Sequence, residues 1–161
     1  MTVAEYNHSV NEYADRLYRF VLKNLREEDI ARDVVQDTYE KLWVKHEQVS
    51  YSKVRSYLFT AAYHTLIDYT RKKKNLVEIE QLSHMESEGI KGHFDLKSTL
   101  NRVLDQLPEI QRTVILLRDY EGYNYEEIGE ITGLSESQVK VYIYRGRLAL
   151  RKLIGTPEVL I

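Results

Sequence analysis

The sequence predicts an all-α fold: two small helical domains joined by a flexible linker, of which the C-terminal domain is a helix-turn-helix. Composition is the first reason, because only 7 Gly and 2 Pro among 161 residues favour long helices over a turn-rich sheet protein. The second is spacing, since apolar residues recur at helical intervals along most of the chain. The third is a pair of helix-start signals close together near the C-terminus. A chain of this length can form one medium domain or two small ones.

The N-terminal part of the chain predicts helices over residues 4–26, 30–45 and 54–73. Asp29 is a suitable N-cap for the second helix, because its carboxylate can accept hydrogen bonds from free backbone N–H groups. The third helix ends in a run of Arg and Lys, which suits the negative end of a helix dipole. The polar stretch from His46 to Lys53 is expected to be a loop.

Residues 76–96 predict the linker, because Ser, Glu, Gly and His dominate residues 83–93 and helical spacing is lost there. Some helical pattern persists over residues 76–80, which is compatible with a short helix at the start of the linker. The two domains are therefore expected at residues 1–75 and 97–161.

The C-terminal domain carries the clearest local signals. Pro108 suits the start of one helix and Gly122 suits its end, because Pro fixes a helical φ and Gly adopts the left-handed cap. Capping boxes then open two further helices, with Asn124 and Ser135 as the N-caps. A tight turn at Gly133 joins these helices. They are expected over residues 125–132 and 136–153.

Charge is segregated along this domain. The net charge of −2 argues mildly against nucleic acid. However, Lys97–Glu136 holds four basic and eight acidic residues, whereas Ser137–Gly155 holds five basic residues and no acidic one. A short acidic helix followed by a longer basic helix is what a DNA-reading helix-turn-helix needs. The alternative is a helical hairpin whose basic face is merely solvated.

The outward positions of the last helix are candidates for reading a major groove. Gln138 can pair with adenine, and Arg145 can pair with guanine or a phosphate. Lys140 is suited to neutralising phosphates. The predicted DNA readers are Ser137, Gln138, Lys140, Val141, Tyr142 and Arg145.

Two helix faces in the N-terminal domain are further candidates for binding. One lies opposite the apolar side of the 30–45 helix and carries Asp33, Gln36, Asp37, Glu40 and Trp43. A Trp beside acids and an amide is typical of a protein-binding face, because Trp anchors interfaces. The alternative is a solvated face with the Trp tucked under the neighbouring loop.

The other face follows a second stripe along the 54–73 helix. An aromatic and a histidine interleaved with a basic end could stack unpaired bases and steer a nucleic-acid backbone. The alternative is a tyrosine-rich core helix with a basic C-terminus. The stripe comprises Tyr57, Thr60, His64, Ile67 and Arg71.

Four stretches together resemble the extracytoplasmic-function (ECF) sigma factors of the sigma-70 family. Residues 29–43, DIARDVVQDTYEKLW, resemble the family's helix that binds core RNA polymerase. Residues 54–71, VRSYLFTAAYHTLIDYTR, resemble its promoter −10 helix. Residues 104–118, LDQLPEIQRTVILLR, and 125–135, YEEIGEITGLS, resemble its −35-binding domain. The resemblance covers nearly the whole chain in the family's order. One departure is Gly146, which stands where the family usually has Ala, at a cost of about 1 kcal/mol inside a helix.

The resemblance implies the partners. The acidic face with Trp43 would dock on the β′ clamp helices of core RNA polymerase, and the C-terminal domain would meet the β flap. The His46–Lys53 loop would capture a flipped −10 base, and the C-terminal readers would contact −35 DNA. An anti-sigma factor is a further implied partner, and the protein is expected to be a cytoplasmic monomer without membrane insertion. The implied −10 contacts are Arg55, Tyr57, Thr60, His64, Arg71 and Lys72.

The resulting hypothesis is a non-enzymatic initiation factor whose free form is compact and hides its DNA faces until polymerase separates the domains. One rival is a dimeric helix-turn-helix regulator, which would not require the acidic face with Trp43 or the aromatic stripe. The other rival is an enzyme. With no cysteine and five histidines without metal spacing, no metal, cofactor or catalytic residue is expected.

Overall fold

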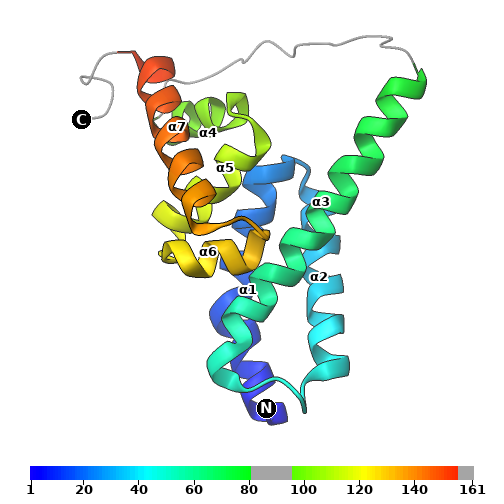
Figure 1. The fold of residues 1–161 in the computed structure, drawn as a ribbon. Helices are drawn as coiled ribbons and strands as arrows, with labels where there is room; N and C mark the ends of the chain where they lie inside the picture. The colour runs from blue at the N-terminus through cyan, green and yellow to red at the C-terminus, as the bar shows by residue number, and fades with distance from the viewer. Residues whose placement is uncertain (81–95, 156–161) are drawn as a thin grey trace.

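The computed structural model describes residues 1–80 and 96–155, and all regular structure within these ranges is helical. The predicted all-α class, two-domain organisation and helix-turn-helix are confirmed (Figure 1). The elements are α1 (Val3–Leu25), α2 (Glu28–Lys45), the 3₁₀ helix η1 (Tyr51–Lys53), α3 (Val54–Glu80), α4 (Leu96–Gln106), α5 (Glu109–Ile115), the π-helix η2 (Leu116–Tyr120), α6 (Tyr125–Thr132) and α7 (Glu136–Ile154).

Helices α1, α2 and α3 form the N-terminal domain around one apolar core. Leu17 and Phe20 on α1, Leu42 on α2, and Leu58 and Leu66 on α3 are each at most 2% exposed. Helix α1 opens with a capping box, which satisfies backbone donors that a helix start leaves free. The core therefore fixes the faces that α2 and α3 turn outward.

The C-terminal domain is built on α6 and α7. Both predicted capping boxes are confirmed, with Asn124 and Ser135 as N-caps. Gly133, at φ +81°, makes the left-handed turn between the helices. Ile128 on α6 and Ile143 on α7 are buried in the same core. The first helix thus braces the second, as the sequence predicts.

The helix boundaries differ from the predictions mainly at the junction of α1 with α2 and at the end of α3. Helix α1 ends at Arg26 in the left-handed conformation, at φ 61°, so the chain turns sharply and α2 begins at Glu28. The predicted N-cap Asp29 is therefore wrong: it lies in the first turn of α2, where its charge suits the helix dipole. Helix α3 continues to Glu80, so residues 76–80 are helical. At the other end of the predicted linker Leu96 begins α4, and the linker residues 81–95 lie outside the described residues.

The structure also explains Gly146. A Cβ atom there would lie 2.4 Å from Cδ1 of Ile115 and 3.3 Å from its Cγ1. Ile115 is 2% exposed, so its side chain has little room to move. Glycine therefore allows α7 to approach α5 closely, which offsets its poor helix propensity. This close approach was not visible in the sequence.

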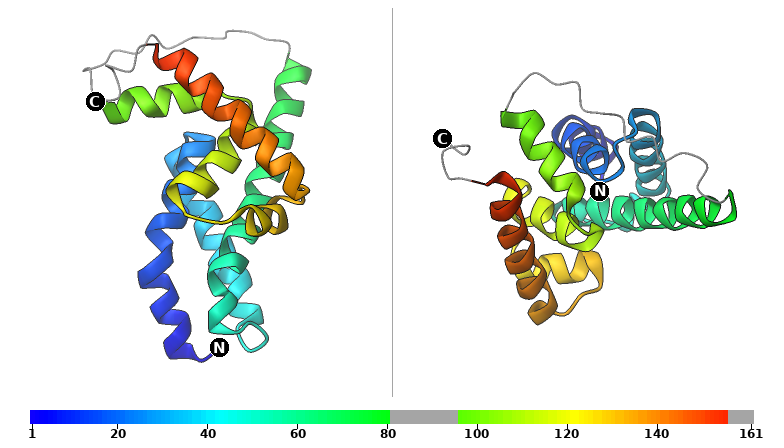
Figure 2. Two further views of the ribbon diagram at one scale, coloured as in Figure 1. Left: turned by 60° about the vertical axis from the view of Figure 1, so that its left-hand side comes forward. Right: turned by 90° about the horizontal axis from the view of Figure 1, so that it is seen from above.

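The two domains pack against each other, with α1 against α4 and α5, and α3 against α6 (Figure 2). Their contact is partly polar. Oγ1 of Thr113 donates to Oδ1 of Asn24 over 3.1 Å, and both residues are buried. Arg26 and Asp105 form an ion pair of 2.9 Å at the edge of this contact. A compact form is therefore what the structure shows.

Candidate functional site

The acidic face of α2 lies on the outside of the N-terminal domain. Its five predicted residues share that side, because Ala31, Val34 and Leu42 occupy the buried side. Nε2 of Gln36 donates to Oε1 of Glu40 over 3.4 Å. The structure therefore brings together the predicted face, namely Asp33, Gln36, Asp37, Glu40 and Trp43.

Trp43 is held in place by other aromatic rings but remains 45% exposed. Its indole stacks on His46, with ring centroids 4.5 Å apart and an interplanar angle of 11°. Tyr6 packs edge-on against it at 5.1 Å, and the hydroxyl of Tyr6 donates to the backbone oxygen of Tyr39 over 3.1 Å. Trp43 is thus a fixed, half-exposed ring at the end of an acidic face, which is what an interface anchor requires.

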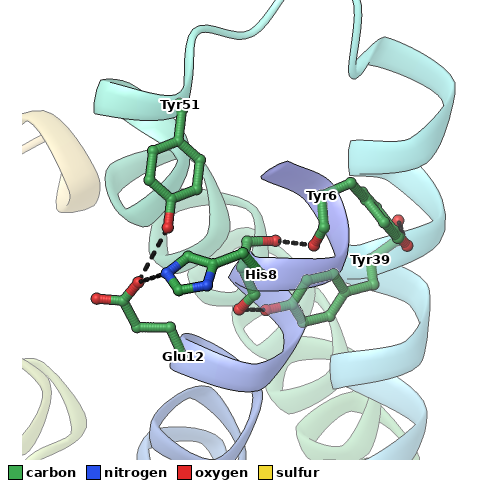
Figure 3. A network of polar contacts seen from close by, with 6 residues as sticks. Tyr6, His8, Glu12, Tyr39 and Tyr51 are labelled. Carbon is green, nitrogen blue, oxygen red and sulfur yellow. Dashed lines mark hydrogen bonds and ion pairs between the residues drawn. The ribbon is translucent and has the colours of Figure 1, made fainter. Parts of the chain in front are cut away.

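The loop between α2 and α3 is fastened to α1 (Figure 3). The Tyr51 hydroxyl donates to Oε2 of Glu12 over 3.0 Å, and Nε2 of His8 lies 3.2 Å from the same oxygen. Desolvation, reinforced by the Glu12 hydrogen bond, raises the pKa of Tyr51 to about 12. Nearby, the Tyr39 hydroxyl donates to the Ser9 backbone oxygen over 2.8 Å. The loop therefore has a defined position relative to α3.

A groove of about 700 Å³ runs between this loop and α3. Tyr57, Thr60 and His64 line it from α3, and Gln48 and Lys53 line it from the loop and η1. The helical stripe and the predicted base-capture loop therefore meet in one groove. Its aromatic and hydrogen-bonding lining can hold an unpaired base and its sugar. Another of its lining residues, Glu130, comes from α6 of the C-terminal domain.

Three predicted −10 contacts lie outside the groove. Arg71 and Lys72 are exposed further along α3, where they extend a basic edge. Arg55, on the contrary, is directed into the other domain. Its Nη2 donates to the backbone oxygen of Glu121, and its guanidinium lies 4.1 Å from the ring centroid of Tyr123. In this arrangement Arg55 does not line the groove, and its Nη2 is bonded to a turn of the C-terminal domain.

The outward face of α7 is open to solvent on the side of the molecule away from α2 (Figures 1 and 2). Gln138 is engaged in the capping box, where its Oε1 accepts from the Ser135 N–H over 2.9 Å. That oxygen is needed for a two-bond contact with adenine, so such a contact would require the box to open. The predicted readers that are exposed are Ser137, Gln138, Lys140, Val141 and Arg145.

Tyr142 differs from the other predicted readers in its exposure. It is partly buried and packs against the core beside Ile143. Tyr144 is instead 69% exposed and shares the outward face with Ser137 and Val141. The sequence contained a signal for this, because position 144 is one turn beyond 141 and two turns beyond 137. Tyr142 is therefore less exposed than the other predicted readers, and Tyr144 is an exposed residue of the outward face that the prediction did not include.

Two features are absent from the described residues. Among residues 1–80 and 96–155, no three His, Cys, Asp or Glu side chains are grouped so that they could hold a metal ion. Within those same ranges, no helix is both long and apolar enough to cross a membrane.

The helix-turn-helix and its basic, exposed helix α7 place the chain in the class of two-domain helical DNA-binding proteins. The comparisons with known proteins agree. Residues 10–76 match the model of sigma-70 region 2, and residues 98–150 match that of sigma-70 region 4. RNA polymerase sigma factor SigV of Bacillus subtilis is 30% identical over 144 residues, which cover 88% of this chain and 86% of SigV. ECF RNA polymerase sigma factor SigM of the same organism is 27% identical over 146 residues, covering 88% and 90%.

A solved structure gives the same result for the whole fold. The sigma factor RpoE of Bartonella quintana, in complex with the anti-sigma factor NepR, matches with a TM-score of 0.80 and 26% identity, covering 94% of this chain and 98% of RpoE. The chain belongs to the sigma-70 family, as an ECF sigma factor. It is an RNA polymerase sigma factor, which acts in promoter recognition and transcription initiation, and sigma factors are non-catalytic.

Proposed function

We propose that this sigma factor binds core RNA polymerase chiefly through the acidic face of α2, with Trp43 as the anchor. The supporting observation is that Trp43 stays 45% exposed although the rings of Tyr6 and His46 pack against it. A large exposed ring beside a row of carboxylates suits a partner surface with apolar pockets and basic side chains. The β′ clamp helices are the proposed partner of this face, and the β flap is the proposed partner of the C-terminal domain.

The groove between α3 and the 46–53 loop is the proposed site for the melted −10 strand. Tyr57, Thr60 and His64 would stack and hydrogen-bond an unpaired base. Arg71 and Lys72 would hold the backbone next to it. Arg55 would join them only after the domains separate, because Glu121 and Tyr123 occupy it in the compact form.

The open face of α7 is the proposed site for −35 duplex. Val141 can meet a thymine methyl group, and Arg145 can contact a guanine or a phosphate. Tyr144 belongs to this site by its position on the same face. Lys140 would neutralise phosphate. Residues 1–75 and 97–161 would thus be the two promoter-binding domains, with residues 76–96 between them.

The remaining proposals concern the oligomeric state, the cellular location and the regulator of the protein. The protein would act as a monomer in the cytoplasm, where core polymerase works, and would leave all covalent chemistry to the polymerase. An anti-sigma factor is proposed as a regulator, because the similar RpoE structure contains one, NepR.

Transcription in vitro with core polymerase on a library of random promoter sequences tests the proposal. We expect transcripts that depend on the added protein and start downstream of one shared sequence element. A library that yields no protein-dependent start site would overturn the proposed function.

A further inference from the structure

The loop that forms one side of the groove, residues 46–53, is fastened on its other side to α1. Ser50 and Lys53 line the groove. Tyr51, which lies between them in sequence, is directed instead to α1, where its hydroxyl donates to Oε2 of Glu12 over 3.0 Å (Figure 3). The same short segment therefore contributes one side to the groove and bonds to a different helix with the other.

Hydrogen bonds within the loop are local, so its placement over α3 depends on contacts from further along the chain. The N–H groups of Gln48 and Lys53 each donate, over 2.9 Å, to a backbone oxygen three residues earlier, which shapes a single turn. The longer-range bonds come from the region of α1. The nitrogen of Met1, just before α1, donates to the oxygens of His46 and Val49 over 2.6 and 2.8 Å. The Tyr51 hydroxyl adds a side-chain bond to this set.

Glu12 has a defined position because α1 is anchored on α2 one turn earlier. Ser9 is 0% exposed, and its backbone oxygen accepts from the buried Tyr39 hydroxyl over 2.8 Å. Nε2 of His8 lies 3.2 Å from the same Glu12 oxygen that accepts from Tyr51. The carboxylate is therefore in place for the Tyr51 hydroxyl, and the bond between them requires little additional ordering of α1.

We propose that Glu12 is a positioning residue for capture of the unpaired −10 base: it acts through Tyr51 to hold the loop where the base binds. The proposal rests on the proposed function, because it concerns the same groove. A loop already held in its binding geometry loses less conformational entropy on binding than a free loop does. The Glu12 side chain is 44% exposed, so its bond with Tyr51 should change the affinity by about three- to tenfold and not more.

A double-mutant cycle on the full chain bound to core polymerase tests the proposal. Tyr51→Phe removes only the donor, Glu12→Ala removes the acceptor, and a third variant carries both changes. The measurement is the fluorescence anisotropy of a labelled −10 non-template strand from a promoter recovered with the natural protein. Each single variant should weaken binding by about three- to tenfold, and the double variant should be no weaker than the weaker single one. Additive losses, or no loss in either single variant, would overturn the proposal.

A scan of the same strand with single abasic sites separates positioning from a general loss of structure. In the natural protein, removal of the captured base should weaken binding more than removal of any other base. In Tyr51→Phe and Glu12→Ala this excess should shrink by about three- to tenfold, while affinities for core polymerase and for a −35 duplex stay unchanged. An undiminished excess, or an equal loss of all three affinities, would contradict a positioning role.

Two further variants control for the change in charge. Asp15→Ala removes a carboxylate from the same helix, where Asp15 pairs with Arg19 at 3.1 Å, and should leave −10 binding within about twofold. Glu12→Gln keeps an oxygen that can accept from Tyr51 and should retain most of the affinity. Equal losses in Asp15→Ala and Glu12→Ala would overturn the role of Glu12 but leave the proposed function intact. Failure of the natural protein to bind any −10 strand with core polymerase would instead overturn the proposed function.

Discussion

The two proposed DNA-binding faces differ in how the free protein presents them. The face of α7 is solvent-exposed and basic, whereas the face of α3 is partly covered by acidic groups and a turn of the other domain. Charge contributes to this difference, because Glu121 and Glu130 belong to the acid-rich stretch that precedes α7. Glu121 pairs with Arg16 and its backbone oxygen accepts from Arg55, while Glu130 lines the same groove as Lys53. A near-neutral chain can thus cover one DNA face with its own carboxylates and leave the other open.

The largest expected effect is a loss of stability in the domain that carries the α7 face. Gly146→Leu places a side chain where Ile115 already fills the space, so overpacking should lower the free energy of unfolding by about 2–3 kcal/mol. Urea unfolding followed by circular dichroism measures this. Lys152→Leu, at an exposed position of the same helix, should leave stability within about 0.5 kcal/mol. Equal stability of both variants would mean that α5 and α7 do not approach closely.

A second variant acts on the contact between the domains. Thr113→Val keeps the shape of the side chain but removes the donor to buried Asn24, so the free energy of unfolding should fall by about 1–3 kcal/mol. Thr70→Val is the control, because its hydroxyl bonds within α3 to the Leu66 oxygen and is only partly buried. Unfolding curves that coincide for Thr113→Val and the natural protein would show that the domains do not meet at this bond.

The different exposure of Tyr144 and Tyr142 on α7 gives a third prediction. Tyr144→Ala should weaken −35 duplex binding by about 1 kcal/mol without lowering the unfolding midpoint, because the ring is 69% exposed. Tyr142→Ala should instead lower stability, since that ring packs against the core. Fluorescence anisotropy and thermal unfolding separate the two outcomes. The opposite pattern would return Tyr142 to the reading face.

The smallest expected effect concerns pH at the edge of the domain contact. Burial raises the pKa of Asp105, and the charges of Arg26 and Arg112 oppose this only in part. A carboxyl whose pKa is raised by folding adds stability at low pH and loses it as pH rises through that pKa. The natural protein should therefore gain stability relative to Asp105→Asn as pH falls. A stability difference that is constant between pH 3 and pH 7 would contradict this.

Local signals explain why much of the fold could be predicted. The capping boxes at Asn124 and Ser135 are encoded within four residues each, so α6 and α7 begin where the sequence indicates. The acidic face of α2 needs only helical periodicity, and all five of its predicted residues lie together. The roles of these residues in binding polymerase and DNA stay predictions.

Tertiary contacts explain why the remaining features could not be predicted from the sequence. Arg55 was expected to face melted DNA, but its position depends on a turn that lies 66 residues away in sequence. Gly146 was expected to weaken its helix, but its function is set by Ile115 on another helix. The π-helix η2, which helps to place Glu121, has no simple sequence pattern. Such features depend on which surfaces meet, and periodicity along one helix does not contain that information.

The central claim is that the compact protein covers its −10 face and that polymerase uncovers it. Asp68→Cys on α3 and Glu126→Cys on α6 are exposed positions outside the proposed binding residues, and a cysteine-free chain allows specific labelling of both. Energy transfer between dyes at these sites should show one short distance in the free protein and a longer distance when core polymerase is added. A distance that stays the same in the polymerase complex, while transcription proceeds, would contradict the account.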